Sequence, residues 1–464
     1  MGMVQSKRTS VAELQRWAAE LEDQQRLAEA RAAYDEALSL EPGSQSLAEG
    51  RARVALGLKE KHAVEHCQRA LAFHDSQPDR QLRMITTAAA ELGAEAIPLF
   101  EDFIRRNPLD VAAHELFAEF RGEHCPGNDY TDAYLAALRE DPTNKPLLMS
   151  YWNLLTRAGR SEEALASMTA NRSLFSGDHD FSLLEANIAI HAGLVEWAGP
   201  VVERLDASPE ARLARAQYDL QTGRFEEAAG LLESVVEGQP DNYSAWAFLE
   251  IAWRVLGDPR SKWLSGQPGL VATRELSLNP TQLEEIADAL RALHRSRSEP
   301  IGQSVRGGTQ TSGQLFLQRS PAIDLITDAL AVAIRDAVGA LPPADPRHPL
   351  LKHREMGLAF GPSWSVRLTE GGFHAAHFHP GGVLSSACYI SLPEGPGVGE
   401  ERSGWLEIGR PPPQFGLDLA PLATIEPKPG RLVLFPSYLF HGTRPFAGGE
   451  RLTVAFDLVP VAMD

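Results

Sequence analysis

The sequence has few cysteines and no cysteine motif. Its 464 residues include three cysteines, Cys67, Cys125 and Cys388, which lie far apart in the chain. An odd and scattered set predicts neither a disulfide framework nor a cysteine-based zinc site. A reducing compartment suits such a chain, so we expect a cytoplasmic protein.

Long apolar runs and basic clusters are also missing. No stretch approaches the roughly 20 apolar residues of a membrane-spanning helix. The opening segment MGMVQSKRTSVAELQRW lacks the apolar centre of a secretory signal. The formal net charge is -18, and no run of basic residues is longer than three. A chain this acidic repels phosphate backbones, so nucleic acid is not expected as a partner. Since no apolar run is long enough to span a bilayer, a membrane is not expected as a partner either.

The first half of the chain contains predicted helices that are interrupted by prolines at regular intervals. Segments rich in Ala, Leu and Glu fill the first 270 residues, which predicts successive helices. These segments are interrupted by five prolines whose separations are 66, 34, 67 and 31 residues: Pro42, Pro108, Pro142, Pro209 and Pro240. Each separation is close to one or two multiples of about 34 residues, a repeat period of paired helices.

A short sequence motif also recurs, at a spacing close to twice the same repeat period. GRSEEALA begins at Gly159 and GRFEEAAG begins at Gly223. Glycine allows the chain to turn between two helices, and Ala164 and Ala228 allow those helices to pack closely. These features resemble the tetratricopeptide repeat family over roughly residues 10–255. The resemblance implies an α-solenoid with a groove that binds a peptide or protein. A scaffold or dimerisation surface without a peptide ligand is the alternative.

The pattern changes near residue 255. Residues 256–270 contain Gly, Pro and Ser, which predicts a linker or docking segment. Asn279, Pro280 and Gln282 then form a helix start with a capping box, so we expect a helix over 278–294. A loop at 300–316 and an amphipathic helix at roughly 320–341 follow. We therefore predict two domains, 1–268 and 269–464.

The C-terminal region alternates between apolar and polar residues instead. Short predicted strands are separated by Gly and Pro: SWSVRL, GGFHAAHFH, LSSACYISL, GWLEIG, RLVLFPSYLF and RLTVAFDLVP. Six such strands predict a sandwich or barrel, here braced by the preceding helices. The whole chain is thus expected to be an α + β multidomain protein.

Three of the 14 histidines fall within the short stretch HAAHFHPGG. On a strand, His377 and His379 would share one face, and His374 would point away. His441 follows at the end of RLVLFPSYLFH. Two histidines from one strand and one from a distant strand could converge as a facial metal site with open positions.

These elements resemble the Fe(II)/2-oxoglutarate-dependent oxygenase superfamily. His377, His441 and, ten residues further on, Arg451 match its motif, and phrases such as HFHPGG and PKPGRLVLFPSYLFHGTRPF resemble a branch fused to tetratricopeptide repeats. The resemblance covers about 271–464. It implies a double-stranded β-helix (jelly-roll) that uses Fe(II), 2-oxoglutarate and O₂, with Arg451 binding the far carboxylate of 2-oxoglutarate.

The second ligand position departs from that family pattern. The usual carboxylate is replaced by His379. Imidazole binds ferrous iron well, so a three-histidine site is chemically sound. Ligation by His377 and His441 with water in the third place, or no metal at all, are the alternatives. A similarity to cupins is weaker, because Val383 and Leu384 occupy the positions where cupins carry glutamate.

Further residues are candidates for binding 2-oxoglutarate or the substrate. Arg451 offers paired hydrogen bonds to a carboxylate, with a surface ion pair to Glu450 or Asp457 as the alternative. Thr453 and Tyr389 could add hydroxyl groups to the same carboxylate. An ordinary strand threonine and a half-buried core tyrosine are the alternatives for these two residues.

Candidates for the substrate side are weaker. Trp364 and Arg367 have opposite parity on SWSVRL, so at most one of them faces the pocket. Arg367 could hold an anionic group, or it could form a salt bridge at the sheet edge. Gln310 lies on the predicted glycine-rich loop and could belong to a lid.

The expected activity is that of a dioxygenase that hydroxylates a side chain in a peptide or protein presented by the repeats. This expectation about the substrate rests on analogy between domain layouts. A small-molecule hydroxylase of the same class and a non-catalytic repeat adaptor with a vestigial β-domain are the alternatives.

Overall fold

The computed structural model describes residues 10–74, 77–127, 129–318, 320–393 and 402–461. Contacts divide the chain into two compact units, Met1–Ser150 and Tyr151–Asp464. This division falls inside helix α9 (Lys145–Arg157). The domain boundary at 268/269 stays a prediction, and the repeat helices that follow α9 belong to the same compact unit as the β-strands.

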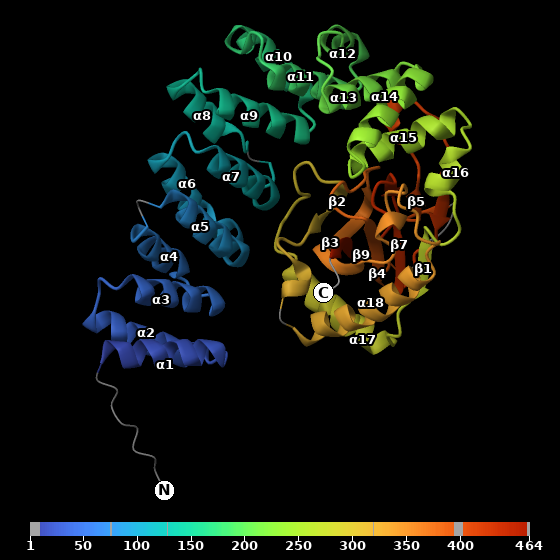
Figure 1. Cartoon of the computed structure of the whole chain (residues 1–464). Helices are drawn as coiled ribbons and strands as arrows, with labels where there is room; N and C mark the ends of the chain where they lie inside the picture. The colour runs from blue at the N-terminus through green and yellow to red at the C-terminus, as the bar shows by residue number, and fades with distance from the viewer. Residues whose placement is uncertain (1–9, 75–76, 128, 319, 394–401, 462–464) are drawn as a thin grey trace. The chain divides into compact units, whose positions relative to one another are not determined.

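The first unit consists of helices that pack in sequence order, as Figure 1 shows for the blue and teal segments. Their bounds are α1 Val11–Asp23, α2 Leu27–Leu40, α3 Gln45–Gly57, α4 Ala63–Ala72, α5 Pro78–Leu92, α6 Ile97–Arg106, α7 Val111–His124 and α8 Asp132–Glu140. Small and medium apolar side chains fill the contacts between neighbours, as in the cluster of Leu14, Ala30 and Leu47. Tetratricopeptide-like helix packing was predicted for this part.

The second unit begins with further helix pairs: α10 Ser161–Asn171, α11 His179–His191, α12 Val195–Val202, α13 Pro209–Gln221, α14 Phe225–Gly238, α15 Tyr243–Val255 and α16 Arg260–Ser265. The predicted turn glycines adopt positive φ, 75° at Gly159 and 77° at Gly223, a region that glycine enters without strain. Ala164 and Ala228 are fully buried, as the helix-pair prediction requires.

Residues 256–270 do not form a plain linker. They contain α16, and Leu264 and Leu270 are buried in the core that the repeats share with the strands. Of the two expectations for this segment, docking agrees with the structure. The Gly and Pro content of the segment gave no sign that Leu264 and Leu270 would be buried.

Helices α17 (Pro280–Leu293) and α18 (Pro321–Gly339) match the predicted ones. The capping box is present, since the Asn279 side chain accepts from the Gln282 amide and the Gln282 side chain accepts from the Asn279 amide. The loop prediction for 300–316 is wrong in part, because Val305–Gln310 forms strand β2. Glycine lowers strand propensity, but Gly308 fits here since a Cβ would collide with the Arg367 carbonyl.

The strands form two antiparallel sheets. The larger has the order β1 (Ala272–Glu275), β7 (Arg431–Pro436), β4 (Leu384–Ser391), β9 (Arg451–Val461), β3 (Gly357–His374) and β2. The smaller has the order β6 (Ala423–Ile425), β5 (Leu406–Ile408) and β8 (His441–Thr443). SWSVRL and GGFHAAHFH were predicted as separate strands. SWSVRL and the first four residues of the second, GGFH, are instead parts of the single long strand β3, which ends at His374.

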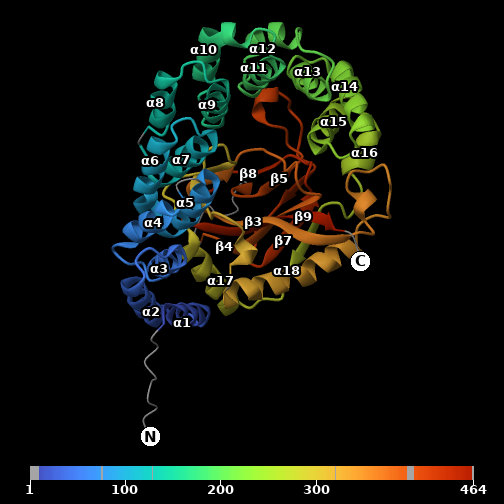
Figure 2. The same ribbon diagram turned by 60° about the vertical axis from the view of Figure 1, so that its left-hand side comes forward.

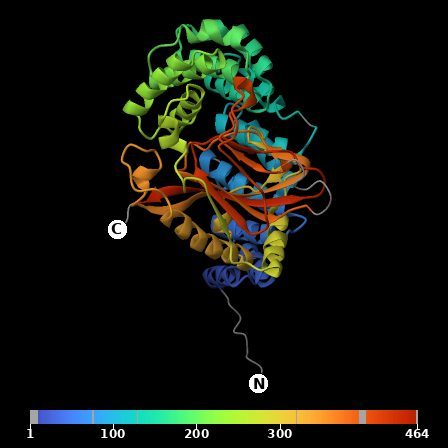
Figure 3. The same ribbon diagram turned by 90° about the vertical axis from the view of Figure 1, so that its right-hand side faces the viewer.

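Helices α17 and α18 lie along one face of the larger sheet (Figures 2 and 3). Alternate residues of β9 join the apolar core on that side, for example Leu452 and Phe456. The intervening residues Arg451, Thr453 and Asp457 therefore project from the opposite face. The predicted combination of a helical solenoid and a jelly-roll-like β-region with bracing helices is confirmed. Among the described residues, no helix is both long and apolar enough to cross a bilayer.

Candidate metal centre

Three histidines converge at the inner face of the β-region. The potential ligand atoms of His377, His379 and His441 all lie within 4.8 Å of one another. His377 and His441 form an isolated antiparallel bridge, with N–O distances of 3.0 and 2.8 Å. The structure thus brings together the three residues that the sequence singled out as ligands.

The segment that carries the first two histidines is not a regular strand. Strand β3 ends at His374, and beyond His377 the backbone is held by the bond from the His379 amide to the Ser437 carbonyl, at 2.9 Å. His374 lies beside the triad, where its Nδ1 is 3.1 Å from Ser304 Oγ and its ring centroid is 6.1 Å from that of His377. The extended backbone still directs His377 and His379 to one side.

Two glycines allow this close approach. A Cβ on Gly382 would lie 2.9 Å from Asp457 Cβ and 3.0 Å from Ser437 Oγ. A Cβ on Gly442 would lie 2.8 Å from the His374 carbonyl oxygen. The glycines of HFHPGG and LFHGT are therefore places where the ligand-bearing backbones pass other atoms too closely for any larger residue.

Hydrogen bonds fix the orientation of each imidazole. His377 Nδ1 lies 2.8 Å from the Ala375 carbonyl, and His441 Nδ1 lies 3.1 Å from the Leu439 carbonyl. A carbonyl oxygen can only accept, so both Nδ1 atoms donate. Each ring then presents the lone pair of Nε2, which is the arrangement that a metal-binding histidine needs.

His379 has a carboxylate behind it. Its Nδ1 lies 2.7 Å from Oδ1 of the buried Asp457, which also accepts a 2.7 Å bond from the Ser385 hydroxyl. The sequence reasoning treated Asp457 only as a possible ion-pair partner of Arg451. The signal that could have revealed its position is parity, since Asp457 shares its face of β9 with Arg451 and Thr453.

Burial keeps the imidazoles of His377 and His441 neutral. Burial, with the neighbouring His379 as the next contribution, lowers the pKa of His377 to about 3. Burial also lowers the pKa of His441 well below the ordinary histidine value, and the charge of His377 acts in the same direction. Metal binding requires the deprotonated imidazole, so protons offer little competition at neutral pH.

Arg451 is a buried guanidinium without a carboxylate partner among the described residues. Its side chain donates to the Gly404 carbonyl at 2.7 Å, and its guanidinium carbon lies 4.8 Å from the ring centroid of Tyr389. Burial lowers the pKa of Arg451. The carboxylates proposed as alternative partners are engaged elsewhere, Glu450 with Arg291 and Arg367, and Asp457 with His379.

Buried polar atoms around Arg451 lack hydrogen-bond partners within the described part of the chain. They are Arg451 Nε, Tyr389 Oη and Trp405 Nε1. Tyr389 is fully buried rather than half-buried, and it pairs across the sheet with Thr453. Unsatisfied buried donors are costly, and Arg451 and Tyr389 contact each other, so their donors indicate a place for a polar ligand. Trp405 was missed by the sequence reasoning.

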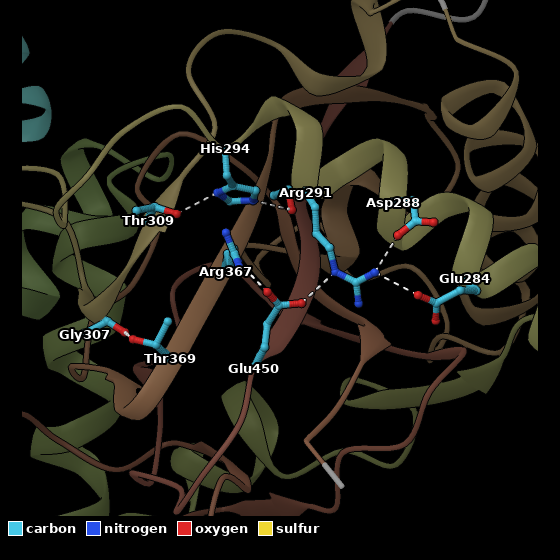
Figure 4. A network of polar contacts seen from close by, with 10 residues as sticks. Glu284, Asp288, Arg291, His294, Gly307, Thr309, Arg367, Thr369 and Glu450 are labelled. Carbon is cyan, nitrogen blue, oxygen red and sulfur yellow. Dashed lines mark hydrogen bonds and ion pairs between the residues drawn. The ribbon is translucent and has the colours of Figure 1, made fainter. Parts of the chain in front are cut away.

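Arg367 does not point toward the histidines. Figure 4 shows it reaching Glu450, with Nε 2.5 Å from Glu450 Oε2, while Arg291 of α17 binds the other carboxylate oxygen at 2.8 Å. This is the salt bridge that was left open as the alternative. Trp364 has the opposite parity, and its ring centroid lies 5.6 Å from that of His379.

Gln310 is the last residue of β2, where it pairs with Val366 of β3. It is therefore part of an edge strand rather than of a glycine-rich loop. The prediction that Gln310 belongs to a loop is wrong, because β2 continues the sheet through the two glycines that precede Gln310.

Comparisons with known proteins agree with this architecture. Residues 362–457 match a family model described as "Putative 2OG-Fe(II) oxygenase", and residues 213–258 match a tetratricopeptide repeat model. The chain therefore carries a 2OG-Fe(II) oxygenase domain. It combines this domain with tetratricopeptide repeats in one polypeptide. No curated protein matches its sequence.

Three solved structures illustrate the similarity: two are similar to one part of the chain and the third to another part. A prolyl-4-hydroxylase from Pseudomonas putida has 18% identity over 42% of this chain and 94% of its own, with a TM-score of 0.29. A tetratricopeptide repeat protein from Parabacteroides merdae has 14% identity over 52% and 98%, with a TM-score of 0.30. HygX from Streptomyces hygroscopicus, solved with nickel and 2-oxoglutarate, has 13% identity over 41% and 83%, with a TM-score of 0.28.

Proposed function

We propose that the chain is an Fe(II)- and 2-oxoglutarate-dependent dioxygenase that hydroxylates a side chain of a peptide or protein. The observation that carries the proposal is the pairing of three inward imidazoles with a buried, carboxylate-free arginine. Oxygenase chemistry of this class needs a facial metal site with open positions and an anchor for a dicarboxylate. The inner face of the sheet offers both.

His377, His379 and His441 are the proposed metal ligands, each through Nε2. His379 supplies an imidazole at the position where a carboxylate is usual, but Asp457 accepts a hydrogen bond from its Nδ1 at 2.7 Å. A carboxylate in this position raises the basicity of the imidazole and fixes its ring. Asp457 thus provides, one hydrogen bond away, the negative charge that the ligand set itself lacks.

Arg451 is the proposed anchor for the distal carboxylate of 2-oxoglutarate. Among the described residues, Arg451 Nε and Tyr389 Oη have no hydrogen-bond partner, so both are donors that a carboxylate would satisfy. Thr453 lies opposite Tyr389 and shares its face of β9 with Arg451. It is the third proposed donor, because within the described part of the chain its Oγ1 donates only to the Val366 carbonyl, at 3.5 Å. Charge-assisted bonds from a buried arginine are both strong and geometrically selective.

When bound, Fe(II) with 2-oxoglutarate and O₂ supplies hydroxylation of an unactivated C–H bond, coupled to conversion of 2-oxoglutarate into succinate and CO₂. The chain's own residues orient the ligands and keep water from the pocket. Trp364, beside His379, is the proposed wall on the substrate side. Arg367 and Gln310 have no direct part in this proposal.

A cavity in the first unit supports a peptide substrate. It has a volume of about 460 Å³ and is lined by apolar and charged side chains of α3, α4 and α5, including Leu56, Met84, Glu49, Arg80 and Arg83. An apolar hollow with a few polar groups is typical of a binding site, and a side chain of the peptide is its proposed occupant. The proposal is therefore that the repeats bind the polypeptide whose side chain is hydroxylated.

The first test is spectroscopic. Fe(II) and then 2-oxoglutarate are added anaerobically to the purified chain, and the visible metal-to-ligand charge-transfer band is recorded. We expect a band that His441→Ala abolishes and that Arg451→Ala recovers only at much higher 2-oxoglutarate concentration. Arg367→Ala, on the adjacent strand but on the opposite face, is the matched control and should titrate like the wild type. No band in the wild type would refute the oxygenase assignment.

The substrate class needs a second measurement. Succinate formation is compared after adding either a desalted protein extract or the small-molecule fraction of the same extract, followed by a search for +16 Da peptides. Stimulation by the protein fraction alone, with a hydroxylated peptide, supports the proposal. Stimulation by the small molecules alone would replace it with a small-molecule hydroxylase.

A further inference from the structure

Helix α15 of the last repeat contacts the segments that carry the candidate ligands. The ring centroid of Phe248 lies 5.9 Å from that of Phe378 and 5.5 Å from that of Phe440. Phe378 stands between His377 and His379 in the sequence, and Phe440 directly precedes His441. The two rings also contact each other, with centroids 5.0 Å apart.

Alternation along an extended backbone explains this arrangement. Since His377 and His379 point to one side, Phe378 must point to the other. The same holds for Phe440 and His441. Both ligand-bearing segments thus turn an aromatic residue toward α15, and Phe248 fills the space that the two rings leave. The cluster is apolar and enclosed, with Phe248 and Phe440 each 5% exposed.

A polar attachment supports the same contact nearly two turns further along the helix. Arg254 of α15 donates to the carbonyl oxygens of Gly409 and Ala420. The Gly409 amide in turn donates to the Phe440 carbonyl at 2.6 Å. Ile408, the preceding residue, pairs with His441 across β5 and β8. Arg254 of α15 therefore binds the smaller sheet next to His441, the candidate metal ligand that this sheet carries.

Helix α16 supplies a third attachment. The hydroxyl of the fully buried Tyr438 donates to the Leu264 carbonyl at 2.7 Å. Tyr438 lies in the turn between β7 and β8, three residues before His441. The turn that delivers the third histidine is thus held from the repeat side as well.

We propose that Phe248 is a positioning residue of the metal centre, so that the last repeat holds the two ligand-bearing segments in the orientation that the ligands need. The inference rests on the proposed function, because it requires the three histidines to bind a metal. The 375–380 segment lacks regular strand pairing beyond the His377–His441 bridge. Single backbone bonds from Ala375 to Ser304 and from His379 to Ser437 hold its two ends, and side-chain packing from α15 adds a constraint that a longer ladder would otherwise give.

The test uses the full chain and cobalt(II) as the probe, because its d–d absorption reports both affinity and coordination geometry. Phe248→Leu keeps an apolar side chain of smaller size, and Phe248→Ala extends the series. Trp246→Phe is the matched control, since Trp246 lies on the same helix but contacts Trp253 and Trp263. Thermal midpoints are measured for every variant.

We expect Phe248→Leu to weaken cobalt binding by about 10-fold, within the range known for groups that orient metal ligands, and to change the d–d spectrum. The affinity of Trp246→Phe for cobalt should stay within about 2-fold of the wild type, even if its thermal midpoint falls as much as that of Phe248→Leu.

Wild-type binding that Phe248→Leu and Phe248→Ala leave unchanged would overturn the inference alone. Equal weakening by Trp246→Phe at equal loss of stability would overturn it too, because the effect would then be a general loss of folding. Absence of cobalt binding in the wild type would overturn the proposed metal site, and the inference with it.

Discussion

Helices α3 and α15 have 13 residues each and occupy the same kind of place in the repeat pattern, yet they bury different side chains. The buried positions of α3 hold mainly small or medium residues such as Ala48, Ala52 and Val54. Helix α15 buries ten residues, among them Tyr243, Trp246, Phe248 and Trp253. The first helix packs on its neighbours in the array, and the second packs on its neighbours and on the β-region.

The difference shows how a repeat array can end on another domain. A terminal repeat normally needs a polar outer face, because nothing follows to cover it. In α15 the corresponding face is aromatic, and it is covered by the strands that carry the candidate metal ligands. The sequence YSAWAFLEIAWRV is apolar all round, which is the signature of a helix covered on every side.

The largest expected effect is a loss of metal affinity when a carboxylate beside the metal centre is changed, compared with no loss when a carboxylate of the first unit is changed. Asp457→Asn keeps an oxygen that can accept from His379 but removes the charge, so metal affinity should fall by about 10- to 100-fold. An anaerobic Fe(II) titration measures this fall. Asp35→Asn, which removes a carboxylate paired with Arg51 in the first unit, is the control. Equal affinities for all three proteins would show that the charge of Asp457 has no role.

A second comparison concerns two glycines. Gly442→Ala places a Cβ against the His374 carbonyl, whereas Gly43 has open space around it. We expect Gly442→Ala to lower the free energy of unfolding by about 1–3 kcal/mol, as overpacking does. Gly43→Ala should change it by less than about 1 kcal/mol. Urea denaturation followed by circular dichroism measures both. A similar loss at the two positions would contradict the close approach at Gly442.

A third comparison concerns two arginines of α15 and α3. Arg254→Met removes bonds to two backbone carbonyls and should cost about 1–2 kcal/mol, because the carbonyls lose their partner in a partly buried place. Arg53→Met removes a more exposed pair with Glu22 and should cost less than about 1 kcal/mol. Thermal unfolding ranks the two variants, and the opposite ranking would deny that Arg254 fastens α15 to the strands.

The smallest effect is a difference in pH dependence between two glutamates. Burial raises the pKa of Glu250 in α15 to about 7. The group therefore favours folding below its unfolded pKa, and that contribution is lost as the pH rises toward 7. In α3 burial acts to raise the pKa of Glu49, but hydrogen bonds from Gln45 and His74 and the charge of Arg80 lower it overall. Its contribution is present above the unfolded pKa and is lost as the pH falls.

Variants separate the two contributions. Glu250→Gln should remove the decline in thermal midpoint between about pH 4.5 and pH 7. Glu49→Gln should instead flatten the decline below about pH 4.5. Thermal midpoints from about pH 3 to pH 8 provide the measurement, and identical profiles for the two variants would contradict these assignments.

Much of the candidate site was accessible from the sequence because strand alternation reports which residues share a face. The convergence of His377, His379 and His441, and the burial of Arg451, agree with the structure for this reason. The start of α17 was equally accessible, since a capping box is a local interaction.

Long-range pairing explains what the sequence did not reveal. Strand β2 contains two glycines and is stabilised by β3, more than 50 residues away in the chain. The role of Asp457 depends on a contact with His379, which precedes it by 78 residues. The aromatic character of α15 was visible, but nothing in the sequence indicates which partner covers each of its faces.

The ring of Phe248 has a consequence for how such proteins can be recombined. A gene fragment that starts at the first strand would encode every candidate ligand but would omit the residue proposed to position them. Chimaeras that graft this oxygenase onto a new carrier should therefore be cut upstream of α13, so that the transplanted piece brings its own last repeat with it.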